Sequence, residues 1–231
     1  MNFSSFEQLV FSRRAVRDFL PDVISDEILE KILRTTQQAP SGYNLQPVNF
    51  YIIKSHQYKE AIVSACLRQN AIISAPVILG LAADRNVHKH HFEKICDQDI
   101  QAGAITEEIR EKFKLFVDMN FSHSPLGMGW VAKAFFAPFL KLFSPMPELP
   151  AVHKKAWLYL HIGLSAMNCM LAAQSAGLST CPIGSFDARR VKRALKIPRS
   201  FELPLLLALG YSKEQPKART RLPLESVIHW R

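Results

Sequence analysis

Apolar and polar positions along the chain follow two periodicities, one typical of helices and one typical of strands. Apolar residues spaced three and four positions apart, together with capping residues such as Ser25 and Ser55, predict helices. These are expected at residues 5–11, 26–39, 55–67, 87–120 and 151–176, with one more helix starting after Asp187. Short apolar runs predict strands at residues 48–54, 76–83, 179–183 and 203–211, before an extended tail.

The longest apolar segment, residues 151–176, predicts a helix at the centre of the fold. It has few charged residues after Lys155, and Gly177 follows it where helices commonly end. The stretch before it, about residues 105–150, is rich in aromatic residues and interrupted by Pro and Gly, which indicates an excursion from the core. The sequence has no internal repeat or low-complexity linker. It therefore predicts one domain, residues 1–231, with this helical and aromatic excursion inserted.

Length and composition narrow the classes of protein and partner. A chain of 231 residues with 48% hydrophobic content can bury an ordinary core, which argues against disordered and fibrous classes. The chain has 29 Lys and Arg against 20 Asp and Glu, so its net charge of +9 favours anionic partners. The basic residues are spread out and form no Lys/Arg run with interleaved aromatics. Nucleic acid is therefore not an expected partner.

Cysteine spacing and the N-terminal sequence predict a cytoplasmic protein. The four cysteines include no CxxC pair and no dense framework, which suits reduced thiols. The N-terminus lacks the pattern of a secretory signal. The apolar stretch 126–143 contains Lys133, Pro138 and Lys141, each costly in a helix that spans a membrane alone. A peripheral membrane contact through this stretch stays open, because its lysines flank aromatic residues.

Four short clusters along the chain suit a phosphorylated, planar cofactor. They are RRAVRDF at 13–19, APSGYNLQP at 39–47, STCPIGSFD at 179–187 and RTRLP at 219–223. Guanidinium groups suit phosphate oxygens, and Arg219 and Arg221 would face the same side of an extended strand. The second cluster offers polar donors in a loop, and Gly184 in the third lets a backbone approach a ring closely. Together they predict a flavin site.

In this order, and with LALGY before RTRLP, the clusters resemble the flavin-dependent nitroreductase family. The resemblance runs from residue 13 almost to the C-terminus, apart from the middle excursion. It implies an α+β, nitroreductase-like three-layer fold with a central, mostly antiparallel sheet flanked by helices. It also implies an intertwined homodimer that binds FMN at the subunit interface.

The resemblance also implies which residues bind FMN. They are Arg13, Arg14, Arg17, Pro40, Ser41, Asn44, Gln46, Asn70, Pro182, Ile183, Gly184, Ser185, Arg219 and Arg221. Two arginine pairs, Arg13 with Arg14 and Arg219 with Arg221, would bind the phosphate, and Arg17 would contact the ring. The 40–46 loop would contact the FMN of the partner subunit. For Asn70, a role at a helix end is the alternative. Ala15 and Val48 depart from the Ser and the aromatic residue common in the family.

Three further groups of residues have competing interpretations. The candidates for lining the substrate are Phe113, Phe116, Phe121 and Trp130, whose alternative is packing in a dimer contact or in the core of a lid. Cys181 is expected to be a buried structural thiol. His88, His90, His91 and Cys96 match no zinc spacing and lie near lysines, so we expect surface histidines and no metal site.

The resemblance implies an oxidoreductase in which the flavin carries the chemistry, so no catalytic side chain is assigned. Hydride would pass from NADH or NADPH to a small, planar, electron-poor acceptor, a nitroaromatic or a quinone, by a ping-pong mechanism. No GxGxxG motif selects the donor. The alternatives are a flavin storage or sensor module without fast turnover, a family variant that performs reductive dehalogenation or enone reduction, and a membrane-associated basic protein.

Overall fold

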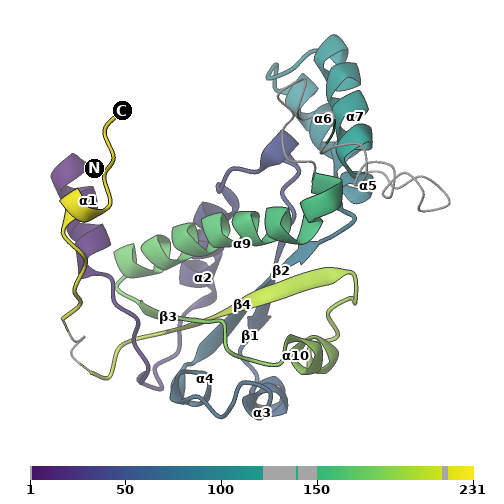
Figure 1. Ribbon diagram of the computed structural model, residues 1–231. Coiled ribbons are helices and arrows are strands. Elements are labelled where there is room, and N and C mark those ends of the chain that lie inside the picture. Colours follow the sequence, from purple (N-terminus) through teal and green to yellow (C-terminus); the bar gives the residue numbers. More distant parts are fainter. Residues whose placement is uncertain (1, 122–138, 140–149, 215–217) are drawn as a thin grey trace.

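A four-stranded antiparallel sheet forms the centre of the protein (Figure 1). The computed structural model describes residues 2–121, 139, 150–214 and 218–231. The strands are β1 (Val48–Ile53), β2 (Val77–Asp84), β3 (Ser179–Ile183) and β4 (Phe201–Gly210), and their order in the sheet is β1-β2-β4-β3. Every residue of β2 is buried, because helices cover both faces of the sheet.

The two helical layers bury different apolar faces of the sheet. On one face, α9 (Pro150–Ser175) packs beside α2 (Asp26–Gln37) over residues such as Leu79 and Leu207. On the other face lie α3 (His56–Val63), α4 (Asn70–Ser74) and α10 (Ala188–Ala194), above a core that includes Ile78 and Leu206 (Figure 1). The predicted three-layer α+β fold is confirmed.

The central position predicted for the long apolar helix is also confirmed, because α9 contacts all four strands. By length and composition alone, its span Lys154–Ser175 could cross a membrane. Packing against α2 and the sheet accounts for the buried side of this helix, which includes Leu158 and Ile162, whereas Leu160 on another side is exposed. The stretch 126–143, which the sequence offered for membrane contact, lies outside the described residues except for residue 139.

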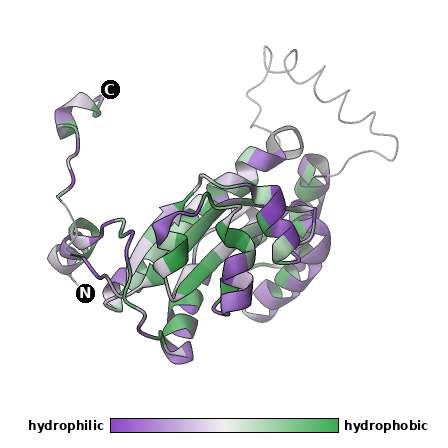
Figure 2. Ribbon diagram, turned by 90° about the horizontal axis from the view of Figure 1, so that it is seen from below, coloured by the Kyte–Doolittle hydropathy of each residue, from purple (hydrophilic) through white to green (hydrophobic). Residues whose placement is uncertain are grey.

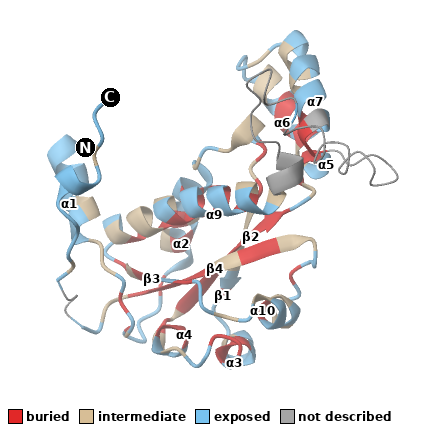
Figure 3. Cartoon of the chain, in the orientation of Figure 1, coloured by how far each residue is buried: buried red, intermediate tan, exposed pale blue. Residues whose placement is uncertain are grey.

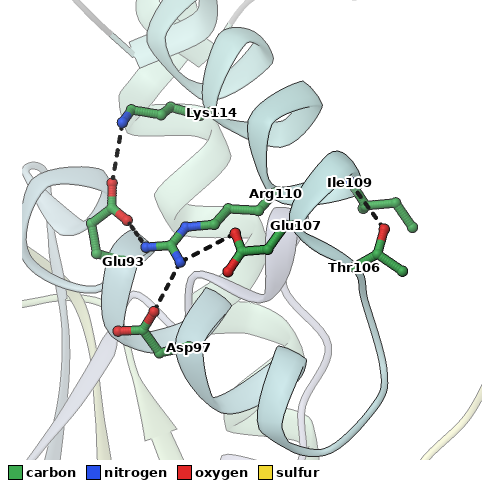
Figure 4. Close-up of polar contacts among 7 residues, drawn as sticks. All are labelled: Glu93, Asp97, Thr106, Glu107, Ile109, Arg110 and Lys114. Carbon is green, nitrogen blue, oxygen red and sulfur yellow. Dashed lines mark hydrogen bonds and ion pairs between the residues drawn. The ribbon is translucent and has the colours of Figure 1, made fainter.

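Three helices after β2 form a lobe with its own small core. They are α5 (Val87–His90), α6 (Phe92–Gln101) and α7 (Glu107–Phe121). Arg110 of α7 joins the last two, because its guanidinium pairs with Glu93 and Asp97 of α6 and with Glu107 (Figure 4). The Arg110 side chain is 20% exposed, but each of its carboxylate partners is more than half exposed, so this is a surface network that joins the two helices.

The two ends of the chain lie away from the sheet. The first helix, α1 (Phe3–Ser12), has no buried residue, and the tail that carries the short helix η2 (Leu224–Ser226) meets it where Arg219 donates to the Val10 carbonyl. Figures 2 and 3 show the same segments projecting from the body of the protein and largely exposed. Several large apolar side chains there, among them Phe3, Leu222 and Trp230, face solvent in the isolated chain. An exposed apolar surface of this kind is typical of a protein interface.

Most predicted elements are confirmed, and the departures have local causes. The helix expected to reach residue 67 ends at Val63, because Leu67 and Arg68 take left-handed backbone angles and turn the chain. The helical stretch predicted at 87–120 is divided into three helices, with a turn at Gly103 (φ 70°). The short helices α4, η1 (Gly42–Asn44) and η2 were not expected from the sequence.

Candidate functional site

The first arginine cluster is fixed along the outer strand β3. Ala15 forms a parallel bridge with Thr180, and the Val16 amide donates to the Thr180 carbonyl at 3.1 Å. Beyond it, the side-chain amide of Asn70 donates to the Arg17 carbonyl at 2.9 Å. Asn70 is the first residue of α4 and fastens the cluster to the start of that helix, and its role toward FMN stays a prediction. The backbone carrying the arginines is held at both ends.

The structure brings the first and last arginine clusters together around one hollow of about 510 Å³. The described residues that line it are Arg13, Arg14, Ala15, Val16, Arg17, Pro182, Glu214, Ala218, Arg219 and Arg221. Although about 200 residues separate the clusters in sequence, Arg219 donates to the carbonyl of Val10 at 3.0 Å. Burial and the nearby positive charges of Arg221, Arg14 and Arg13 lower the pKa of Arg219.

This hollow suits a phosphate group. Five guanidinium groups line it against the single carboxylate of Glu214, among the residues that the structure describes. The arginines repel one another, and an anion with several oxygens would relieve that repulsion while accepting their hydrogen bonds. The hollow is therefore a candidate for the phosphate end of a cofactor.

The segment after β3 extends from the floor of the same hollow. Pro182 lines it, whereas the Ile183 side chain is 3% exposed and points into the core. Gly184 and Ser185 are exposed, and the Ser185 carbonyl accepts a hydrogen bond from Gln69 at 2.8 Å. A Cβ on Gly184 would meet no atom nearer than 4.0 Å, so the fold alone does not require glycine there. The open backbone at this position can be approached by a flat ring.

The loop of the second cluster has an unusual backbone. Tyr43, Asn44 and Gln46 have φ angles of 54°, 53° and 47°, in the left-handed region that non-glycine residues seldom occupy. The hydroxyl of Ser41 stabilises this turn by accepting from the Gln46 amide at 2.9 Å. Such strained backbone is concentrated at functional sites, where surrounding contacts hold it in place.

His161 of α9 supplies one of those contacts. Its Nε2 accepts a hydrogen bond from the Gly42 amide at 3.0 Å, and its Nδ1 donates to the Trp157 carbonyl at 2.6 Å. Accepting at Nε2 requires a neutral ring, and burial lowers the pKa of His161, which favours that form. A Cβ on Gly42 would lie 3.3 Å from Trp157 Nε1, so the close approach of loop to helix favours glycine.

Neither His161 nor Trp157 is among the site residues predicted from the sequence. A signal was present, because His161 is a polar residue in a helix that is otherwise nearly all apolar. A buried histidine in such a helix usually has a specific hydrogen-bonding partner. Its partner, Gly42, is 119 residues away in sequence, which no local pattern could indicate.

A second hollow, of about 470 Å³, lies beside this loop. Pro40, Ser41 and Gln46 line it together with Phe50 and His161. Asn44 lies outside it, where its side-chain amide is 3.4 Å from both carboxylate oxygens of Asp99 on α6. Three of the four predicted loop residues therefore share one hollow, and the fourth connects the loop to the helical lobe.

Within one chain, the two hollows lie toward opposite ends of α9. The loop packs on Trp157 and His161 in the first half of that helix, whereas the arginine hollow adjoins β3, which follows its C-terminal end (Figure 1). From His161 to Ser175 the helix advances about 20 Å at its usual rise per residue. The predicted cofactor residues thus form two separate groups in a single chain.

The aromatic residues predicted to line a substrate site take different positions. Phe121 is 1% exposed and packs edge-on against Trp157, with ring centroids 5.1 Å apart. Phe113 is partly buried against Tyr43 of the loop, and Phe116 is exposed. Trp130 lies outside the described residues. Phe121 thus forms part of the core of the helical lobe, and a substrate role for these residues stays a prediction.

The sequence predicted that the histidines of the cluster lie on the surface, but the structure buries one of them. His88 is 8% exposed and stacks on Phe121, and neither ring nitrogen has a hydrogen-bond partner among the residues that the structure describes. Burial and the charges of Lys154 and Lys89 lower its pKa to about 4. His90 pairs with Asp84, and His91 contacts the Leu45 carbonyl. The surface interpretation is therefore wrong for His88.

Cys181 is buried, as predicted, and burial raises its pKa. A raised pKa keeps the group as a thiol, which is a poor nucleophile. The nearby charge of Arg17 acts in the opposite direction as a smaller effect. The other three cysteines are also free and buried.

Comparison with known proteins gives consistent matches along most of the chain. The model of the nitroreductase family matches residues 10–211. A protein of Thermus thermophilus named NADH dehydrogenase is 29% identical, over 95% of this chain and 92% of its own length. The 4-nitrobenzoate reductase of Pseudomonas putida is 28% identical, over 95% and 91%. A protein of Exiguobacterium sibiricum, provisionally named a nitroreductase and solved in complex with FMN, aligns with a TM-score of 0.75 at 22% identity, covering 98% and 97% of the two chains.

Proposed function

The chain belongs to the nitroreductase family, and on that basis we propose that it is an FMN-dependent oxidoreductase. The proposed reaction is hydride transfer from NADH or NADPH, through bound FMN, to a planar, electron-poor acceptor in ping-pong order. One observation carries the proposal. Two arginine clusters from opposite ends of the sequence meet Pro182 at a single hollow that suits a phosphate group.

The residues of this chain bind and orient the cofactor in the proposed site. Arg13, Arg14, Arg219 and Arg221 hold the phosphate, and Arg17 places a fixed positive charge near the ring. A positive charge close to the ring favours its reduced, anionic form, which adjusts the reduction potential of the bound flavin. No side chain needs to act as a nucleophile or as a general base.

We propose that the functional protein is an intertwined homodimer. The 40–46 loop of one subunit would complete the site formed by the arginine hollow of the other, because the two groups are separated within one chain. The exposed apolar side chains of α9 support this assembly. Leu160 is 60% exposed, and Leu164 and Met167 lie on the same side of the helix.

The surroundings of the loop support the proposed class of acceptor. The second hollow combines the aromatic ring of Phe50 with the polar groups of Ser41, Gln46 and His161, a mixture that suits a small planar molecule with polar substituents. The relative from Pseudomonas putida is named for reduction of a nitroaromatic acid. We therefore propose a nitroaromatic or a quinone as the acceptor, with Phe113, Phe116 and Trp130 as candidate lining residues.

The primary experiment is a visible spectrum of the purified protein, followed by anaerobic addition of NADH and NADPH separately. We expect flavin absorption that is lost on mixing with at least one donor and restored by a nitroaromatic or a quinone. Flavin that binds but is not reduced would instead favour a storage or sensor role. A protein that cannot bind FMN would refute the proposal.

The same preparation can distinguish the variant chemistries within the family. A panel of acceptors would include an activated enone and a halogenated aromatic beside the nitroaromatic and the quinone. Faster reoxidation by the enone, or release of halide, would assign enone reduction or reductive dehalogenation to the same cofactor site.

The phosphate assignment is tested by the double variant Arg219→Ala with Arg221→Ala. Its control is Lys31→Ala with Lys94→Ala, which removes the same charge from exposed positions on α2 and α6. We expect the first variant to lose most of its FMN while its circular dichroism is unchanged, and the control to keep it. Equal FMN content in both would contradict the assignment.

We also propose that residues 1–231 form one domain in the cytoplasm. The four free, buried cysteines support a reducing compartment. Cell fractionation tests the location, and a single cooperative unfolding transition would support the one-domain division.

A further inference from the structure

We propose that a third hollow, which is lined by basic residues of α10 and the turn that follows it, binds a small soluble molecule carrying two or more phosphate groups. The hollow measures about 700 Å³, within the usual range for small-ligand sites. Its lining residues in the described part of the chain are Arg85, Arg189, Lys192, Arg193, Lys196, Ile197, Pro198 and Arg199. The proposed flavin site uses none of them.

Positive charge is concentrated at this hollow. Residues 188–200 contain six basic residues and no acidic one, in a chain whose net charge is +9. Glu202 neutralises Arg85, but Arg189, Arg193, Lys196 and Arg199 have no ion-pair partner among the described residues. Four unpaired cations around a concave surface repel one another, and a multiply charged anion would relieve that repulsion.

The hollow is held in a defined shape. The ammonium of Lys192 donates to the carbonyls of Arg199 at 3.2 Å and Phe201 at 2.7 Å, which ties the turn to α10. The side chain of Ile197 is buried and anchors the middle of the turn in the core. Lys196 has a left-handed backbone with φ of 54°, a position where glycine or asparagine is common. A preorganised cluster of cations loses less entropy on binding than a flexible one.

The hollow is separate from the arginine hollow of the proposed flavin site. In Figure 1, α10 lies at the α3 side of the sheet, far from α1 and the segment that carries Arg13 and Arg17. The two sets of lining residues have no member in common. A ligand at α10 can therefore bind while FMN is present.

The form of the hollow favours a small polyphosphate over a large anionic partner. Its lining contains no aromatic side chain among the described residues, so it offers no platform for stacking nucleic-acid bases. Of its described lining residues, the one large aliphatic side chain, Ile197, is buried and cannot enter a bilayer. The cations surround a concave space, whereas a flat membrane or a duplex requires a broad basic face.

The experiment is calorimetric titration of FMN-saturated protein with inorganic tripolyphosphate. Saturation with FMN occupies the arginine hollow, and the fluorescence of released FMN reports any displacement from it. The test variant is Arg193→Gln with Lys196→Asn, because asparagine tolerates the left-handed backbone at that position. The control, Lys31→Gln with Lys94→Gln, removes two charges elsewhere. Should the test variant fail to fold, Arg189→Gln with Arg199→Gln replaces it.

We expect one saturable tripolyphosphate site per chain without release of FMN. Binding should weaken about tenfold in the test variant, and with added salt, because each lost cation removes a charge-assisted contact. The control should keep its affinity within about twofold. Three results would overturn the proposal: no saturable binding, equal loss in both double variants, or tighter binding to anionic phospholipid vesicles or to DNA than to tripolyphosphate.

Discussion

Protonation of His88 should destabilise the fold in mildly acidic solution. The imidazole stacks on Phe121, has no partner for either nitrogen in the described part of the chain, and faces the positive charges of Lys154 and Lys89. Asp84 and Asp118 offset these charges only partly, and the pKa falls from 6.5 to about 4. The fold therefore holds His88 in its neutral form.

The sign of the effect follows from linkage between protonation and folding. Between the two pKa values the unfolded chain binds a proton at this histidine and the folded chain does not, so acid favours unfolding. The stabilisation is complete above the ordinary pKa of 6.5 and is lost as the pH falls toward about 4. Between about pH 7.5 and about pH 5, the loss from His88 is at most about 2 kcal/mol.

Urea unfolding at these two pH values measures the effect in three proteins. The free energy of unfolding of the wild type should fall by up to about 2 kcal/mol between the higher and the lower pH. His88→Leu should remove most of this loss and leave the free energy of unfolding at the higher pH nearly unchanged. The control is His56→Leu, whose native side chain is 88% exposed, and it should keep the pH dependence of the wild type. If His88→Leu were as acid-sensitive as the wild type, the neutral buried histidine would not be the cause.

Three further predictions concern the dimer, the sheet and the loop. Leu160→Glu with Leu164→Glu should give monomers by sedimentation and reduce FMN content, whereas monomers that keep full FMN would refute a site shared between subunits. Gly210→Ala should lower the free energy of unfolding by about 1–3 kcal/mol in urea titrations, because the new methyl would lie 2.6 Å from a proline ring, and unchanged stability would show that the ring can move. His161→Leu should cost about 1–3 kcal/mol by leaving the Gly42 amide unpaired, and His161→Gln, which keeps an acceptor, should restore part of the loss if that hydrogen bond is the cause.

The local elements could be predicted from the sequence because their signals are local. Ser25 and Asp187 cap the helices that follow them, and Gly177 ends α9 with a φ of 75°. Short apolar runs located all four strands. The family resemblance implied a mostly antiparallel sheet but not the order of its strands, since the pairing of β2 with β4 joins segments more than 100 residues apart.

The sequence could predict which residues form the arginine hollow, but not the contacts that bring them together. Residue type suggested that the first and last clusters bind phosphate, yet their meeting depends on Ala15 pairing with Thr180 and on Arg219 reaching Val10. The burial of His88 was missed because its partner Phe121 lies 33 positions away in the helical lobe. A polar residue in a charged stretch such as VHKHH reads as exposed until tertiary packing is known.

The attachment of the loop to the helical lobe has a consequence for exchanging parts between relatives. The Asn120 side chain donates to the Tyr43 hydroxyl at 3.0 Å, and the Asn44 amide approaches Asp99. A chimera whose new lobe lacks Asn120 and Asp99 would lose both contacts, which would leave the strained turn supported by Ser41 and His161 alone. We therefore expect that exchanging the lobe requires residues 41–46 to be moved with it.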